Sequence, residues 1–140
     1  MAITTRELSV TSRRLDYTDV DFSFTVSPVT NGLVLKRGEE AVKQSVLNIL
    51  LTGRGEKPFQ PTFGTQLRNL LFEPFDVALA AVIEEDIRLT LNNFEPRLRV
   101  QNIRVNDLPD RNSLEVTVTG EIISPELSEL EIQFIVERLR

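Results

Sequence analysis

The stretch "NNFEPRLRVQNIRV", residues 92–105, is where the hydrophobic period of the chain changes from that of a helix to that of a strand. Before it, in "VALAAVIEEDIRLTLNNF" (77–94), apolar residues recur every three or four positions, which predicts an amphipathic helix. The predicted stripe consists of Ala80, Ile83, Ile87, Leu91 and Phe94. Pro96 predicts the end of this helix, because the residue before a proline is pushed out of the helical region.

Beyond Pro96, apolar and polar residues alternate, as in a strand that buries one face. Leu98 and Val100 follow one phase of this alternation, whereas Ile103 and Val105 follow the opposite phase. A β-bulge near residues 101 and 102 would keep all four side chains on the same face of a sheet.

Two further strands are predicted towards the C-terminus. "NDLPDRN" (106–112) is typical of a turn, and "SLEVTVTGEI" (113–122) alternates apolar with polar side chains. "ELEIQFIVERLR" (129–140) alternates in the same way, with Ile135 facing away from the apolar side. The apolar faces consist of Leu114, Val116, Val118 and Ile122, and of Leu130, Ile132, Phe134 and Val136.

Two more helices are predicted upstream. "EEAVKQSVLNILLTG" (39–53) follows Gly38 and has acidic residues in its first turn and a glycine at its end. Its apolar face consists of Val42, Val46, Ile49 and Leu50. "TQLRNLLF" (65–72) is a shorter candidate that Pro74 ends, and "DFSFTVSP" (21–28) alternates as in a short half-buried strand.

Helices followed by consecutive strands predict an α+β fold, in which two to three helices cover a small, largely antiparallel sheet. A chain of 140 residues, 41% of them hydrophobic, can bury one core. We therefore expect an N-terminal arm at residues 1–30 and a single domain at residues 31–140.

The composition excludes several classes of function. The chain has no cysteine and no histidine, so it lacks thiolate ligands and the usual general base at neutral pH, and we expect no metal site and no cofactor. A formal net charge of −5 argues against nucleic acid. The start "MAITTRELSV" does not resemble a secretory signal, and no apolar run is long enough to cross a membrane, so we expect synthesis in a cytoplasm.

No catalytic constellation is evident. Glu84 and Glu85 are neighbours on a predicted helix, so their side chains point about 100° apart and cannot flank one substrate. "GRGEKP" (53–58) lacks the spacing of a phosphate loop. Arg97, Arg99 and Arg104 are close enough in sequence to form a small patch that suits a carboxylate-bearing protein partner. We expect no catalytic residues and no small-molecule substrate.

Three stretches together resemble one known family: "RGEKPFQPTFGTQL" (54–67), "NLLFEPFD" (69–76) and "NNFEPRLRV" (92–100). They are similar to the sheath-initiator family of contractile-tail baseplates, a small wedge protein of phage tails with relatives in type VI secretion and other contractile injection systems. The similarity covers about residues 38–140. It implies a structural protein of the virion tail baseplate, or of the baseplate of an injection system, assembled in the cytoplasm.

The resemblance also implies partners. They are other baseplate wedge proteins and the sheath protein, with the tail tube as a further candidate. Glu95, Pro96 and Arg97 are expected to contact a helical bundle of neighbouring wedge subunits, and the C-terminal sheet is expected to accept strands from the first sheath ring. For strand addition we single out Ile132, Gln133, Phe134, Ile135 and Val136.

The loop after the first helix holds aromatic residues between prolines, which would stiffen it for a partner. We expect Phe59 and Phe63 to be interface anchors, Phe72 to be a core residue, and Glu73 and Pro74 to belong to the protein-binding surface. The alternative for the loop is that it folds back on its own helices. For the whole chain, the alternatives are a peptidoglycan-cleaving lysozyme and a cytoplasmic peptide-binding adaptor.

Overall fold

The structure is a computed structural model, and it describes residues 17–111, 113–123 and 128–137. The elements are β1 (Thr18–Val20), β2 (Leu35–Arg37), α1 (Glu39–Leu51), α2 (Leu67–Leu70), α3 (Val77–Phe94), β3 (Leu98–Leu108), a 3-10 turn (Pro109–Arg111), β4 (Ser113–Ile122) and β5 (Ser128–Glu137). This arrangement confirms the predicted α+β class.

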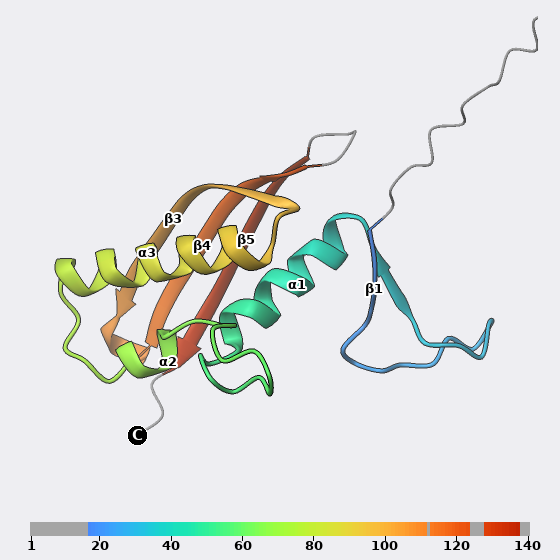
Figure 1. The fold of residues 1–140 in the computed structure, drawn as a ribbon, viewed down its shortest axis with the longest axis horizontal. Helices are drawn as coiled ribbons and strands as arrows, with labels where there is room; N and C mark the ends of the chain where they lie inside the picture. The colour runs from blue at the N-terminus through green and yellow to red at the C-terminus, as the bar shows by residue number, and fades with distance from the viewer. Residues whose placement is uncertain (1–16, 112, 124–127, 138–140) are drawn as a thin grey trace, which may run out of the picture.

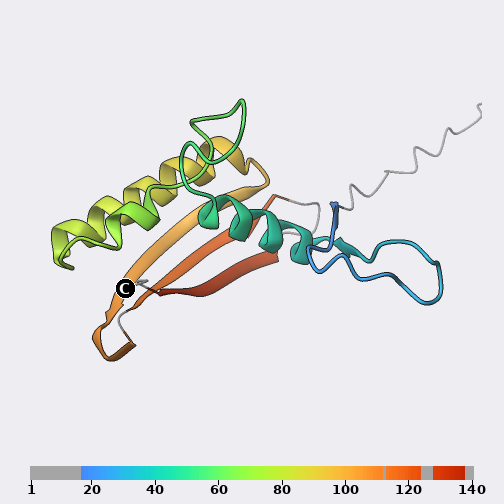
Figure 2. The same ribbon diagram turned by 90° about the horizontal axis from the view of Figure 1, so that it is seen from below.

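The main sheet has the strand order β3-β4-β5, and both pairings are antiparallel. Helix α3 lies over β3 and α1 lies over β5, so both long helices cover the sheet (Figures 1 and 2). The apolar face of β4 is fully buried beneath them, as its alternating pattern predicts. The buried side chains of β4 are Leu114, Val116, Val118 and Ile122.

The predicted bulge in β3 is confirmed. The pairing of β3 with β4 shifts register between Val100 and Asn102, which leaves Gln101 as the extra residue. Leu98, Ile103 and Val105 are buried in spite of their opposite phases. Gly120 pairs with Val100 beside the bulge, and a Cβ on Gly120 would lie 2.6 Å from the Arg99 carbonyl oxygen. The backbones therefore approach there more closely than any side chain allows.

The two long helices form as their stripes predict. In α3, Ile83, Ile87 and Leu91 are buried, while the ends of the predicted stripe, Ala80 and Phe94, are partly buried at the edge of the core. The side chain of Asp76 accepts a hydrogen bond from the Leu79 N–H at 2.6 Å, which caps the first turn. In α1, Val42, Val46, Ile49 and Leu50 are all buried.

Two boundaries differ from the predicted ones. The turn predicted at residues 106–112 is wrong in its first half, because β3 continues to Leu108 and pairs there with Ser113. The short helix predicted at residues 65–72 covers only Leu67–Leu70. Helix α1 ends at Leu51, just before the predicted stop at Gly53.

A second, two-stranded sheet projects from one end of α1 (Figures 1 and 2). It is a hairpin in which β1 pairs with β2, with Val20 opposite Leu35. The half-buried strand predicted at residues 21–28 is wrong: Phe22 and Phe24 are exposed, and Val26 makes only an isolated bridge to Leu33. Among the described residues no second layer covers this segment, so its alternation buries neither face there. The hairpin also spans the boundary predicted at residue 30.

Candidate functional site

The Glu-Pro-Arg corner joins α3 to β3. Glu95 ends the helix, and its side chain is 1% exposed. Arg97 donates two hydrogen bonds to it, from Nε to Oε1 at 2.6 Å and from Nη2 to Oε2 at 2.7 Å. This is the two-pronged geometry that a guanidinium makes with a carboxylate and that lysine cannot reproduce.

This pairing determines the charge state of the corner. Burial by itself would raise the pKa of Glu95, but hydrogen bonds from Arg97 and from Ser45 of α1 outweigh it, so the pKa lies below its ordinary value. The hydrogen bonds to Glu95 raise the pKa of Arg97. Glu95 therefore stays ionised and Arg97 stays protonated at neutral pH, and the two charges hold the corner together.

The corner is also tied to the root of the hairpin. The Arg97 guanidinium lies over the ring of Tyr17, 5.2 Å from its centroid, and the Tyr17 hydroxyl donates to the Ile123 carbonyl at 2.8 Å. The backbone N–H of Ile123 in turn donates to the Arg97 carbonyl at 2.8 Å. Residues from the start, middle and end of the chain thus meet at the corner.

The Glu95 side chain is not available to a partner in this arrangement, because it is enclosed and bound. Of the predicted contact triplet, Pro96 is exposed and the Arg97 side chain is 29% exposed. Arg99 and Arg104 are exposed on β3, but Arg97 is committed to Glu95, so the three arginines do not form one free cationic patch.

The loop between α1 and α2 is held by its own base. Gly53 and Thr65 form a parallel bridge, and the Thr65 hydroxyl donates to the Leu50 carbonyl at 2.9 Å. The Asp86 carboxylate of α3 accepts from the Arg54 side chain and from the Gln66 N–H, each at 2.7 Å. The loop is therefore folded back on α1 and α3, which was the alternative for this segment.

The phenylalanines divide differently from the prediction. Phe63 packs edge to face on Phe94 of α3, with ring centroids 5.1 Å apart, and it contacts the core. Phe72 was expected in the core, and this is wrong: its side chain is 73% exposed. The reason is its position: Phe72 comes three and four residues after the exposed Asn69 and Arg68, so it lies off the face that Leu67 and Leu71 bury. Phe59 is fully exposed.

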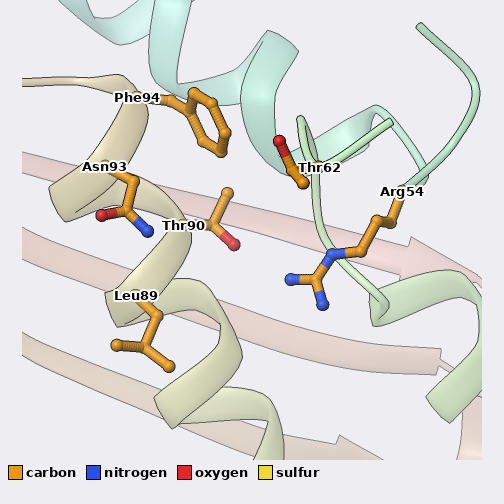
Figure 3. A pocket seen from close by; sticks show the side chains of 6 residues that line it. All are labelled: Arg54, Thr62, Leu89, Thr90, Asn93 and Phe94. Carbon is orange, nitrogen blue, oxygen red and sulfur yellow. The ribbon is translucent and has the colours of Figure 1, made fainter. Parts of the chain in front are cut away.

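Two shallow hollows flank α3. One, of about 510 Å³, lies between the loop and the C-terminal part of α3 (Figure 3). Its lining consists of Arg54, Thr62, Leu89, Thr90, Asn93 and Phe94. The other, of about 370 Å³, is lined in part by the exposed Glu73 and Pro74 and by Asp76. Since the charge of Arg54 is neutralised by Asp86, the first hollow suits a neutral side chain better than an anion.

The predicted augmentation strand is an edge of the main sheet. Within the described ranges β5 pairs with β4 only, in continuous register over ten residues. Ile132 is buried, Phe134 and Val136 are partly buried, and Gln133 and Ile135 are exposed on the open face. The Gln133 side chain donates to Glu115 of β4 at 2.7 Å.

Among the residues that the structure describes, no group of three or more Asp or Glu side chains could hold a metal ion. No helix in this part of the chain is long and apolar enough to span a membrane.

The sequence did not predict three residues that fix the corner and the loop by hydrogen bonds: Tyr17, Ser45 and Asp86. Each acts across a long sequence separation, and the Tyr17 contact to Ile123 spans 106 positions. No local periodicity reports such a contact. The only available signal was that Tyr17 is the single tyrosine of the chain.

The structure is thus an α+β domain with an open sheet edge, a pinned loop and a charge-paired corner, and the comparisons with known proteins give the class of protein to which it belongs. The family described as "Baseplate wedge protein gp25" matches residues 36–126, from the end of β2 to beyond β4, and the chain belongs to this family. It is a baseplate component of a contractile tail system.

One relative is the baseplate wedge protein gp25 of Enterobacteria phage T4, which is 33% identical over 86 residues. The match covers 61% of this chain and 65% of the phage protein, so it spans slightly less than two thirds of that relative.

Two solved structures share the fold. A Geobacter sulfurreducens protein described as a candidate tail lysozyme matches with a TM-score of 0.68 at 21% identity, over 76% of this chain and 96% of its own. A chain of the anti-feeding prophage baseplate matches with a TM-score of 0.62 at 22% identity, over 85% of each chain. The similarity predicted from the sequence covers residues 38–140, which is less than 85% of this chain. The match to the prophage baseplate chain therefore includes part of the segment before α1.

Proposed function

We propose that this protein is a non-catalytic wedge subunit that links neighbouring wedge proteins to the junction of tube and sheath, and that β5 is the template on which the first sheath strands add. The observation that carries this proposal is the difference between the two edges of the main sheet. An exposed edge offers unpaired N–H and C=O groups to another chain.

The edge at β3 is poorly suited to strand addition. Its bulge at residues 100–102 breaks the regular spacing of backbone groups, and bulges are a common means of protecting an edge. The edge at β5 keeps its register from Ser128 to Glu137. An incoming strand could therefore pair with β5 over its whole length, while Glu131, Gln133 and Ile135 offer side chains for selectivity.

The wedge contacts are assigned to exposed groups near the ends of α3. Pro96 and the accessible part of Arg97 lie at one end, while Glu73 and Pro74 lie beside the other. Phe59 adds a fully exposed ring on the loop. Glu95 acts through Arg97, which it holds in place, and Phe63 acts by holding the loop on Phe94.

The test of strand addition is Gln133→Pro, which removes one backbone donor from β5, compared with Gln133→Ala, which removes the side chain and keeps that donor. Sheath growth is followed by electron microscopy on otherwise complete baseplates. We expect sheath growth to fail with proline and to proceed with alanine. Circular dichroism must first show that the proline variant is folded, and normal sheath growth from a folded Gln133→Pro protein contradicts the proposal.

The lysozyme alternative has no constellation to support it among the described residues, since Glu84 and Glu85 diverge and Glu95 is bound to Arg97. A turbidity assay on purified cell walls tests it directly. Clearing by the isolated protein would overturn the non-catalytic assignment.

A further inference from the structure

We propose that residues 22–35, here called the hairpin tip, dock into an uncharged apolar groove on a different protein of the baseplate. This contact is separate from strand addition at β5 and does not depend on it.

The composition of the hairpin tip is unusual for a surface segment. Its fourteen residues include no Asp, Glu, Lys or Arg. Seven of them are large apolar side chains that are between 36% and 90% exposed: Phe22, Phe24, Val26, Val29, Leu33, Val34 and Leu35. So many exposed apolar side chains in one short segment indicate a site of interaction, because they gain free energy only when a partner removes them from water.

The tip has a defined shape. Backbone hydrogen bonds join Asp21 to Val34, Val34 to Thr25 and Ser27 to Gly32 at 2.8–3.0 Å. The rings of Phe22 and Phe24 meet edge to face, with centroids 6.4 Å apart. Phe24 has a φ of 48°, in the left-handed region that aromatic residues rarely adopt. This unfavourable backbone presents both rings to solvent, and such conformations concentrate at functional sites.

The root of the hairpin is anchored, so the tip points in one direction. Gly38 donates its N–H to the Tyr17 carbonyl at 2.7 Å, and the Gln44 side chain of α1 donates to the Val20 carbonyl at 2.7 Å. Together with the bond from the Tyr17 hydroxyl to Ile123, these contacts hold the hairpin away from the main sheet (Figure 2). The tip is thereby presented to a neighbour instead of to its own core.

The lack of charge decides which partner fits. Segments that bind membrane surfaces combine apolar residues with Lys or Arg, and often with Trp or Tyr, none of which occurs in the tip. A second copy of this chain fits the tip less well at the two hollows described above. The hollow beside Glu73 and Asp76 carries carboxylates that an uncharged tip would cover without pairing them. In the other hollow Arg54 is paired with Asp86, but Leu89 and Phe94 are the only apolar residues among the six that line it, so it is not an apolar groove. The remaining occupant is an uncharged apolar groove on another protein.

The test compares two matched variants. Val29→Lys places a charge on the tip, and Leu51→Lys places the same charge at the end of α1, outside the surfaces assigned to partners; the two side chains are 90% and 47% exposed, so both variants should fold. Each replaces the natural chain in cells that assemble the baseplate, and the amount of chain per purified baseplate is measured. We expect Val29→Lys to reduce incorporation about tenfold or more, and Leu51→Lys to leave it unchanged. Equal incorporation of the two variants would overturn the proposal.

A photo-cross-linking amino acid at position 29 then identifies the occupant in baseplates assembled without sheath protein. The expected product is one cross-link to an uncharged apolar segment of a different baseplate protein, and it should persist in the Gln133→Pro background. A cross-link to a second copy of this chain would assign the tip to self-association. Flotation of the protein with vesicles of phosphatidylcholine and phosphatidylglycerol, abolished by Val29→Lys, would assign it to a membrane. Either result, or no cross-link in complete baseplates, overturns the proposal.

Discussion

At the scale of single residues, the Glu95–Arg97 ion pair stabilises the corner between α3 and β3. A carboxylate that is 1% exposed is stable as an ion only because Arg97 and Ser45 donate to it. The proposed partner contact through the exposed part of Arg97 would then depend on an internal ion pair. We therefore expect removal of Arg97 to affect the free protein as well as the assembly.

We predict that Arg97→Ala lowers the free energy of unfolding of the isolated protein by about 3 kcal/mol, because it leaves the Glu95 carboxylate buried without its main partner. The matched control is Arg99→Ala two positions away, where the side chain is exposed and the change should stay within about 0.5 kcal/mol. Urea unfolding at neutral pH measures both. Equal stability of the two variants would mean that the corner contributes nothing to the fold, and its role would then lie entirely in partner contacts.

The same pair predicts a dependence of stability on pH. The pKa of Glu95 is lowered in the folded protein from an ordinary value of 4.5, so the unfolded chain binds a proton first as the pH falls. The stabilisation by Glu95 is fully present above about pH 5 and is lost as the pH falls below 4.5 and through the folded pKa. Glu95→Gln should therefore be less stable than the natural chain at neutral pH and should lose less stability in acid. The free energy of unfolding of the two proteins is measured as the pH falls. If both lose the same amount, Glu95 is not the group that causes the loss of stability in acid.

At the scale of elements, the sequence allowed prediction wherever one face of a helix or strand is buried by a neighbouring layer. This burial is visible in the sequence as the apolar stripe of α3, the phase change in β3 and the alternation in β4. The phase change alone was enough to predict the bulge in β3. The pattern at residues 21–28 has the same alternation, but no layer within the described part of the chain covers it. Alternation shows that a segment can bury one face, and it does not show that a second layer is present.

Phe72 illustrates the same limit within a short element. It follows Leu67, Leu70 and Leu71 in sequence, but at about 100° per residue a longer helix would place it on the exposed side of Arg68 and Asn69, away from Leu67 and Leu71. The Phe72 N–H donates to the Asn69 carbonyl at 3.3 Å in a tight turn after α2, and the ring faces solvent. The hydrogen bonds that hold the candidate site together could not be predicted from local sequence patterns either, because Asp86 and Tyr17 bond to residues far away in the chain.

We predict that Phe63→Ala lowers the free energy of unfolding by about 2 kcal/mol, less than for a fully buried phenylalanine, because Phe63 is partly buried against Phe94. Phe72→Ala should change it by less than about 0.5 kcal/mol, because that ring is 73% exposed. Thermal or urea unfolding of the two variants measures the difference. A larger loss at Phe72 would show that its ring packs against the core in solution, contrary to the structure.

At the scale of the whole molecule, the chain consists of a packed body and a projecting hairpin, and the two have different sources of stability. The body buries its apolar residues between the helices and the main sheet. The hairpin has two strands of three residues each, which is too little for independent stability in water. Its attachment depends on polar contacts at Tyr17, Val20 and Gly38, so its outer part gains most from a partner.

Hydrogen exchange of the free and the assembled protein tests both interaction surfaces in one measurement. In the free protein, amides of β4 should exchange most slowly, because this strand is paired on both sides and its apolar face is buried. Amides of residues 22–35 and the outward N–H groups of β5 should exchange fast, because they lack a covering layer or a second strand.

In baseplates that carry sheath, both sets should slow by about tenfold or more, while the outward amides of β3 stay fast. In baseplates without sheath, only the hairpin tip should slow, since its partner is a different protein. Protection that appears at β3 and not at β5 would move strand addition to the opposite edge of the sheet, and unchanged exchange at residues 22–35 would show that the tip has no partner.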